Sequence, residues 1–137
     1  MRRVYLDSCI VIYLIENAGS FSELTRRFFA NNSSAILYLS PLVRLEVLVK
    51  PMRDKAESLV ADYEDFIAAQ NSLSMNDSIV DQALQLRVRH GLKTPDALHL
   101  ATALHHGCDE FWTNDDRLNK VVSGISVNVF AGSLGDG

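Results

Sequence analysis

Cysteine is scarce in this sequence: only Cys9 and Cys108 occur among its 137 residues. Two cysteines are too few for a disulfide framework, and they fit a reducing compartment in which thiols stay free. Long apolar runs are also missing, because the longest one, residues 9–15, is interrupted by Tyr13 and ends at Glu16. That run is too short to cross a bilayer, and no small-residue cleavage site follows it as in a signal peptide. These absences predict a cytoplasmic protein that has no membrane segment.

An excess of positive charge is absent as well. The chain has 13 lysines and arginines against 17 aspartates and glutamates, which gives a formal net charge of −4. Proteins that coat nucleic acids are usually basic, so this balance counts against that class. It does not exclude an enzyme that holds metal ions with carboxylates, because the metals then supply the positive charge beside a phosphate.

The overall composition is that of a globular protein. Hydrophobic residues make up 47% of the chain and charged residues 22%, which excludes a disordered, collagen-like or disulfide-scaffold sequence. A chain of 137 residues suits one domain and can bury a core without a metal or a disulfide. We expect this domain to span residues 1–130 and to be followed by a flexible, glycine-rich tail over residues 131–137.

Strand-like and helix-like apolar patterns alternate along the whole chain. Short apolar runs bounded by turn residues predict strands at residues 4–6, 35–39, 111–113 and 125–130, with a very short one at Leu73. Three- and four-residue apolar spacing and helix-end signals predict helices at residues 9–16, 20–31, 42–50, 56–67, 77–90 and 96–106. Asn76 is the predicted cap of the fifth of these helices. This alternation predicts an α/β domain in which helices cover both faces of a mainly parallel sheet.

Two of the helix starts depend on specific residues. Ser20 and Glu23 match a capping box, which predicts that the Ser20 side chain caps its helix. Residues 42–50 fit a strand by alternation as well as a helix. The preceding Ser40-Pro41 pair favours the helix, because serine is a common N-cap and proline a common first helical residue.

Four acidic residues lie where a solvated surface acid is not expected. Asp7 directly follows the first predicted strand, and Asp115 follows the strand at 111–113 after one intervening residue. The carboxyl ends of parallel strands form the ligand-binding edge of such a sheet, so both acids should lie there. Asp96 lies in the first turn of a helix that a Thr-Pro pair begins. Glu46 interrupts an apolar run, where an unpaired acid is costly.

Each of these acids also has a purely structural explanation. The two acids at strand exits can be caps or loop residues, and Asp96 can complement the dipole of its helix. Glu46 can pair with Arg44 or Lys50 on an exposed strip. The set is more specific than its members, because a metal-dependent nuclease needs several carboxylates whose repulsion a divalent cation relieves.

Four segments contain these acids in a fixed order and spacing. They are residues 5–8 (Tyr-Leu-Asp-Ser), the helical Glu46, residues 94–103 (Thr-Pro-Asp-Ala-Leu-His-Leu-Ala-Thr-Ala) and residues 113–115 (Thr-Asn-Asp). Together they resemble the PIN-domain family, and within it the small single-domain toxins of the VapC type. The last two segments are the more specific, and the resemblance covers nearly the whole chain, residues 3–130.

This resemblance implies a fold, an activity and partners. The implied fold is a three-layer α/β/α sandwich around a mainly parallel sheet. The implied activity is that of a Mg²⁺- or Mn²⁺-dependent endoribonuclease whose catalytic acids map to Asp7, Glu46, Asp96 and Asp115. Toxins of this type are neutralised by a small antitoxin protein and are commonly homodimers. We therefore expect an RNA substrate, a cognate antitoxin and a homodimer.

Within such a site we divide the acids by role. The expected metal ligands are Asp7, Asp96 and Asp115, which would hold one or two divalent ions. Glu46 would orient or deprotonate the attacking water. His99 follows Asp96 by three residues on the same helix face, and we expect a core or supporting role for it.

Other functions stay open at this point. A phosphatase of the haloacid-dehalogenase type also has an aspartate after its first strand, but it needs a second acid where this chain has Cys9. A response-regulator receiver needs a lysine at the end of a late strand, and no late strand in this sequence is followed by one. The main alternative is a non-catalytic α/β interaction module whose acids bind a structural cation.

The helix that begins at Cys9 is apolar on nearly all sides over residues 9–15. A chain of this size cannot easily bury every such face. We therefore expect this helix to leave an exposed apolar patch that a second copy or an antitoxin segment covers.

Overall fold

The computed structural model describes residues 2–121 and 125–129. Within these ranges it contains five strands: β1 (Arg3–Leu6), β2 (Ile36–Leu39), β3 (Asn71–Ser72), β4 (Glu110–Thr113) and β5 (Ser126–Asn128). They form one sheet in the order β3-β2-β1-β4-β5, and every strand pair in it is parallel. The predicted parallel sheet is thus confirmed, and its very short strand lies just before Leu73.

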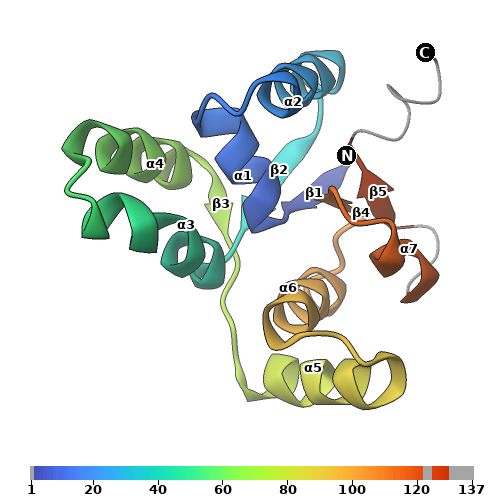
Figure 1. The fold of residues 1–137 in the computed structure, drawn as a ribbon. Helices are drawn as coiled ribbons and strands as arrows, with labels where there is room; N and C mark the ends of the chain where they lie inside the picture. Colours follow the sequence, from blue (N-terminus) through green and yellow to red (C-terminus); the bar gives the residue numbers. More distant parts are fainter. Residues whose placement is uncertain (1, 122–124, 130–137) are drawn as a thin grey trace.

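Helices cover both faces of this sheet. In the described ranges they are α1 (Ser8–Ile15), α2 (Ser20–Asn31), α3 (Pro41–Arg53), α4 (Glu57–Ala69), α5 (Asp77–His90), α6 (Thr94–His105) and α7 (Arg117–Val121). Figure 1 shows α1 and α2 on one side of the sheet and α5 and α6 on the other. This follows from right-handed crossovers, because the chain changes direction across the sheet after β3. The three-layer α/β/α sandwich is therefore confirmed.

The central strand β1 forms the middle of the core. Val4, Tyr5 and Leu6 are all fully buried between β2 and β4. Side chains along a strand point alternately to the two faces of the sheet. Consecutive residues of β1 and of β4 therefore pack against the helix layers on opposite faces. Tyr5 stacks on Phe111 with ring centroids 5.5 Å apart, and Tyr5 faces α6, where it meets His99.

The strand order reverses between β1 and β4. The connection that leaves β1 runs to β2 on one side, whereas the connection that leaves β4 runs to β5 on the other. Divergent connections of this kind leave a crevice at the carboxyl ends of the two strands, where α/β proteins bind their ligands. Asp7 directly follows β1, and Asp115 follows β4, so both lie beside this crevice.

Of the two helix starts that depend on specific residues, one was predicted wrongly and the other correctly. The capping box was wrong: Ser20 is the first residue of α2, and the N-cap is Gly19, which has a positive φ of 63° and makes no side-chain cap bond. Ser40 does precede α3 as its N-cap, so the predicted helix is confirmed. Its hydroxyl, however, makes no cap bond and instead contacts the Tyr5 hydroxyl.

The C-terminal region was predicted less completely. Helix α7 was not predicted, because five residues are too few to show a helical period. The predicted strand at 125–130 is present as β5 over Ser126–Asn128, and Phe130 lies outside the described residues. The predicted tail, residues 131–137, also lies outside them.

The predicted apolar patch on α1 was wrong. Helix α1 packs into the core, with Ile10 and Val11 fully buried. Among the residues whose side chains the structure describes, the large exposed apolar ones instead form one stripe on α3 and one on α5, apart from Phe21 on α2. The α3 stripe is Leu45, Val49 and Met52, and the α5 stripe is Val80, Leu84 and Val88. Of the helices described, none combines the length and apolar character that a membrane span requires.

Candidate active site

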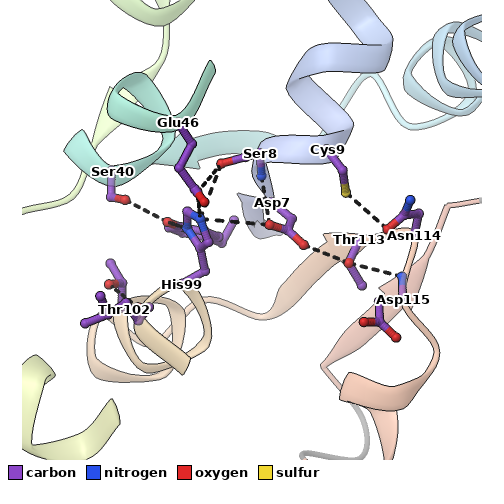
Figure 2. Close-up of polar contacts among 12 residues, drawn as sticks. Asp7, Ser8, Cys9, Ser40, Glu46, His99, Thr102, Thr113, Asn114 and Asp115 are labelled. Atoms are coloured by element: carbon purple, nitrogen blue, oxygen red, sulfur yellow. Dashed lines mark hydrogen bonds and ion pairs between the residues drawn. The ribbon is translucent and has the colours of Figure 1, made fainter. Parts of the chain in front are cut away.

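Asp7 is held at the junction of β1 and α1. Its backbone N–H donates to the carbonyl oxygen of Trp112 at 3.0 Å, which continues the pairing of β1 with β4. Its side chain is the N-cap of α1, with Oδ1 accepting from the backbone N–H of Ser8 at 2.8 Å. Oδ2 accepts from the hydroxyl of Thr113 at 2.9 Å. The carboxylate is therefore fixed by one donor at the start of α1 and one at the end of β4, as Figure 2 shows.

Thr113 connects two of the candidate acids. Its hydroxyl donates to Asp7 and accepts from the backbone N–H of Asp115 at 3.2 Å. It is the last residue of β4 and is fully buried. The sequence pattern did not predict this role, and the only signal was the place of Thr113 at the head of the Thr-Asn-Asp segment.

Asp115 carries an internal counter-ion. Its two carboxylate oxygens accept four hydrogen bonds from Arg117: one from the backbone N–H, two from Nε and one from Nη2, the last at 2.6 Å. The Arg117 guanidinium holds the pKa of Asp115 below its ordinary value. The Arg117 side chain is 73% exposed, so this ion pair lies at the surface and can exchange partners.

Asp96 lies in the first turn of α6, with its side chain half-buried. The N-cap of α6 is Lys93, which makes no side-chain cap bond, so Asp96 is not the cap. No donor in the described part of the chain binds its carboxylate. Burial raises the pKa of Asp96, and the negative charges of Asp7 and Asp115 raise it further. The three aspartates therefore share one electrostatic site although they come from three different elements.

A cavity of about 330 Å³ opens beside Asp96 and Asp115, between the α5–α6 connection and α7. Leu92 and Leu118 contribute to its apolar lining. Lys93 and Arg117 also line it, so the cavity offers two cations next to the two carboxylates. It has the chemistry to take a nucleotide, whose base is flat and apolar and whose phosphate is anionic.

Glu46 reaches the same crevice from α3. Its Oε1 accepts from the Ser8 hydroxyl at 2.7 Å and contacts Nε2 of His99 at hydrogen-bonding distance. Burial by itself would raise the pKa of Glu46, but the bonds from His99 and Ser8 outweigh it and lower this pKa below its ordinary value. The structural alternative of a pair with Arg44 is not realised, because Arg44 binds Glu64 with Nε and Oε1 2.8 Å apart.

His99 is buried beneath Glu46, with a side chain that is only 1% exposed. Its Nδ1 lies 2.6 Å from the Tyr5 hydroxyl oxygen, and that oxygen lies 2.7 Å from Oγ of Ser40. Its Nε2 lies 4.0 Å from Oδ1 of Asp7 as well as in contact with Glu46. The supporting role predicted for His99 fits this position, whereas Tyr5 and Ser40 were not predicted to contribute at all.

The structure thus brings the four predicted acids to one crevice by two routes. Thr113 links Asp7 to Asp115, and Asp115 lines one cavity with Asp96. Glu46 is linked to Asp7 through Ser8 and His99. Across residues 2–121 and 125–129, however, no three Asp, Glu, His or Cys side chains lie close enough together to form a ready-made metal site.

The comparison with known families agrees with this architecture. The model of the PIN domain matches residues 4–123. The chain belongs to the PIN-domain family. Ribonuclease VapC46 of Mycobacterium tuberculosis is 30% identical over 135 residues, which is 97% of this chain and 100% of that protein. The predicted resemblance is thereby confirmed.

Solved structures share the PIN fold over most of the chain. A toxin–antitoxin complex from Klebsiella pneumoniae superimposes with a TM-score of 0.73 at 21% identity, covering 91% of this chain and 97% of that one. VapC20 of Mycobacterium tuberculosis, described as a sarcin–ricin loop cleaving toxin, gives 0.72 at 15% identity, covering 85% and 94%. At these identities the likeness concerns the fold alone.

In this PIN domain the two residues that flank Asp115 are engaged elsewhere. Asn114 accepts from the Cys9 thiol at 3.3 Å and donates to the Tyr13 hydroxyl at 3.1 Å, so it fastens the site to α1. Asp116 accepts from the Asn128 amide at 3.0 Å. Asn114 therefore ties the end of β4 to α1, and Asp116 ties it to β5.

Proposed function

We propose that this PIN-domain protein is a metal-dependent endoribonuclease and the toxin of a toxin–antitoxin pair. The observation that carries the proposal is the convergence of Asp7, Asp96 and Asp115: the Thr113 hydroxyl bonds to both Asp7 and Asp115, and Asp115 and Asp96 line one cavity. Carboxylates crowded in this way need a cation. The full-length relative named a ribonuclease, and the toxin described as cleaving the sarcin–ricin loop, support RNA as the substrate.

The three aspartates suit a divalent metal by their chemistry. Mg²⁺ and Mn²⁺ prefer carboxylate oxygens, and Asp96 has no donor among the described residues to satisfy it. The Arg117 guanidinium donates hydrogen bonds to both carboxylate oxygens of Asp115. A cation that binds Asp115 therefore has to displace this guanidinium. We therefore propose Asp7, Asp96 and Asp115 as the metal ligands.

The remaining residues would perform the acid–base and binding steps. A divalent cation held by the three aspartates would supply Lewis-acid chemistry, lowering the pKa of a water and stabilising the charge that develops on the phosphate. Glu46 accepts the proton of the attacking water through Oε2, because Oε1 is already occupied by Ser8 and His99. Lys93, together with Arg117 once it is displaced, binds RNA phosphates at the rim of the cavity.

The partners of such a toxin would be an antitoxin and a second copy of this chain. The relative from Klebsiella pneumoniae was solved as a toxin–antitoxin complex, which supports a cognate antitoxin for this protein. The exposed stripes on α3 and α5 provide apolar surface for an antitoxin and for a second copy in a homodimer. An RNA substrate and two free cysteines favour a cytoplasmic location.

The alternative is a non-catalytic interaction module with a structural cation. Such an ion contributes to folding, so the module predicts a cation that stabilises the protein without RNA cleavage. The relative named a ribonuclease and the toxin described as cleaving the sarcin–ricin loop favour the catalytic function.

The test is RNA cleavage by purified, metal-stripped protein. We expect cleavage with Mg²⁺ or Mn²⁺, none in EDTA, and a loss of at least about 100-fold in Asp7→Asn, since even residues that only support metal ligands contribute about 10- to 100-fold. Asp62→Asn, which changes an exposed residue of α4, is the matched control and should cleave normally. If a divalent cation stabilises the fold but the protein cleaves no transfer, ribosomal or messenger RNA, the interaction module would be favoured.

A further inference from the structure

A chain of buried polar side chains runs from the interior of the sheet to Glu46. Oγ of Ser40 lies 2.7 Å from the Tyr5 hydroxyl, that hydroxyl lies 2.6 Å from Nδ1 of His99, and Nε2 of His99 contacts Oε1 of Glu46. Figure 2 shows His99 next to Glu46, with Ser40 beside them. Ser40 and Tyr5 are fully buried and His99 nearly so. Burying three polar side chains is costly, and the proposed chemistry above assigns no task to any of them.

The proton positions in this chain follow from the donors and acceptors. A carboxylate can only accept, so Nε2 of His99 must carry the proton that bridges to Glu46. Burial raises the pKa of Tyr5, so its hydroxyl keeps a proton to donate. If Ser40 donates to Tyr5 and Tyr5 donates to Nδ1, each contact along the chain has one donor and one acceptor.

Glu46 is held through only one of its two carboxylate oxygens. Oε1 receives Ser8 from one direction and His99 from another, whereas Oε2 receives no donor from the described residues. The Glu46 side chain is 30% exposed, so without these two donors it could turn into solvent. Fixing Oε1 from two sides leaves Oε2 as the oxygen that faces outward.

We propose that Tyr5 and His99 are positioning residues for Glu46. The Tyr5 hydroxyl selects the His99 tautomer that carries its proton on Nε2, and this N–H holds Oε1 so that Oε2 meets the attacking water. The proposal rests on the proposed function, because it assigns Glu46 the role of base. It differs from a purely structural role, in which the pair would only fasten α6 against β1.

The first test is Tyr5→Phe, which removes the hydroxyl and keeps the ring that stacks on Phe111. We expect kcat to fall about 10-fold, with KM and divalent-ion affinity unchanged, because groups that orient a site residue contribute about 10- to 100-fold. Thr25→Val is the matched control, since it removes an equally buried hydroxyl whose bond goes to the backbone carbonyl of Phe21 in α2, and it should leave kcat unchanged. A kcat for folded Tyr5→Phe within twofold of wild type would overturn the proposal.

The second test exploits the shape of glutamine. The amide nitrogen of His99→Gln can take the place of Nε2, and an amide always carries its protons, so no tautomer has to be selected. We expect His99→Gln to keep most of kcat and the shorter His99→Asn to lose it. Adding Tyr5→Phe to His99→Gln should cost nothing further. A kcat that is retained in His99→Gln but lost in Tyr5→Phe separates the tautomer role from a structural one, because both variants lack the bond between Tyr5 and Nδ1. Equal losses from Tyr5→Phe in both backgrounds would contradict it.

A third measurement needs no activity and separates this proposal from the proposed function. In protein labelled with ¹⁵N-histidine, the His99 signals should show a protonated Nε2 and an acceptor Nδ1, and Tyr5→Phe should abolish this preference. His99→Asn assigns the signals among the four histidines. If wild type shows this tautomer but cleaves no RNA, the proposed function fails. If wild type cleaves RNA and carries its proton on Nδ1 alone, only the positioning role fails.

Discussion

The two halves of the candidate site are built in opposite ways. The buried half consists of Ser8, Glu46, His99, Tyr5 and Ser40, and its side chains form one connected hydrogen-bonded chain. The open half consists of Asp96, Asp115 and Arg117, and it leaves Asp96 without a donor among the described residues while an exposed arginine covers Asp115.

This difference shows which part of the site is complete before any ligand binds. The buried half keeps its geometry by itself, since its low-dielectric surroundings strengthen every bond in it. The open half is left with uncompensated negative charge and one exchangeable cationic side chain. Asp7 joins the halves, because it accepts from Thr113 on one side and lies 4.0 Å from His99 on the other.

The largest expected effect comes from neutralising the open half. Asp96→Asn should lower the rate of RNA cleavage by at least about 100-fold, because it removes a proposed metal ligand. The same change should leave the metal-free protein equally stable or more stable, since repulsion from Asp7 and Asp115 acts against the Asp96 carboxylate. Cleavage rates and thermal melting in EDTA measure the two effects. Clear destabilisation of the variant in EDTA would instead make Asp96 a structural residue.

The buried half should respond in the opposite sense. Glu46→Ala removes the acceptor of a buried His99 N–H, and leaving such a donor unsatisfied costs about 1–3 kcal/mol. Glu46→Gln keeps an acceptor oxygen and should recover most of the free energy of unfolding. Urea denaturation in EDTA measures the loss in each variant. If Glu46→Ala proved as stable as wild type, the buried half would not depend on its hydrogen-bonded chain.

A smaller effect is expected where Arg117 competes with the cation. Arg117→Gln frees Asp115 and should raise Mn²⁺ affinity by a factor of about two to five, because exposed ion pairs contribute only about 0.2–1 kcal/mol. We expect bound Mn²⁺ to quench the fluorescence of the single tryptophan, Trp112, and a titration of this signal measures the affinity. Arg44→Gln breaks a similar pair with Glu64 away from the site and should change nothing. An unchanged affinity in Arg117→Gln would mean that the cation does not use Asp115.

The smallest effects concern the pH dependence of stability without metal. The raised pKa of Asp96 makes its contribution favourable at low pH, and this contribution is lost as the pH rises from its ordinary pKa of about 3.9. The lowered pKa of Glu46 makes its contribution favourable above its ordinary pKa of about 4.3, and it is lost as the pH falls.

Urea midpoints measured between about pH 3 and pH 7 separate these two contributions. As the pH rises, Asp96→Asn should gain on wild type, whereas Glu46→Gln should fall behind it. Curves that diverge from wild type in the same direction for both variants would contradict the opposite signs of the two pKa shifts.

Much of the fold was predictable because its signals are local. The buried run of β1 and the Asn76 cap of α5 follow from neighbouring residues, and the cap is present with Oδ1 accepting from the Ile79 N–H at 3.0 Å. The Ser20 cap failed because the chain before α2 adopts a positive φ at Gly19, and this moves Ser20 inside the helix. The apolar patch was misplaced because apolar content alone does not reveal which helix the sheet covers.

The sequence by itself determined that acids stand at the ends of β1 and β4, since each follows its strand within two residues. It could not determine which side chains would hold them. Thr113 reaches Asp7 across 106 positions, and Tyr5 reaches His99 across 94. These contacts depend on the register of β1 against β4 and on how α6 docks onto the sheet. Both are set by packing of the whole core, so only the tertiary structure decided them.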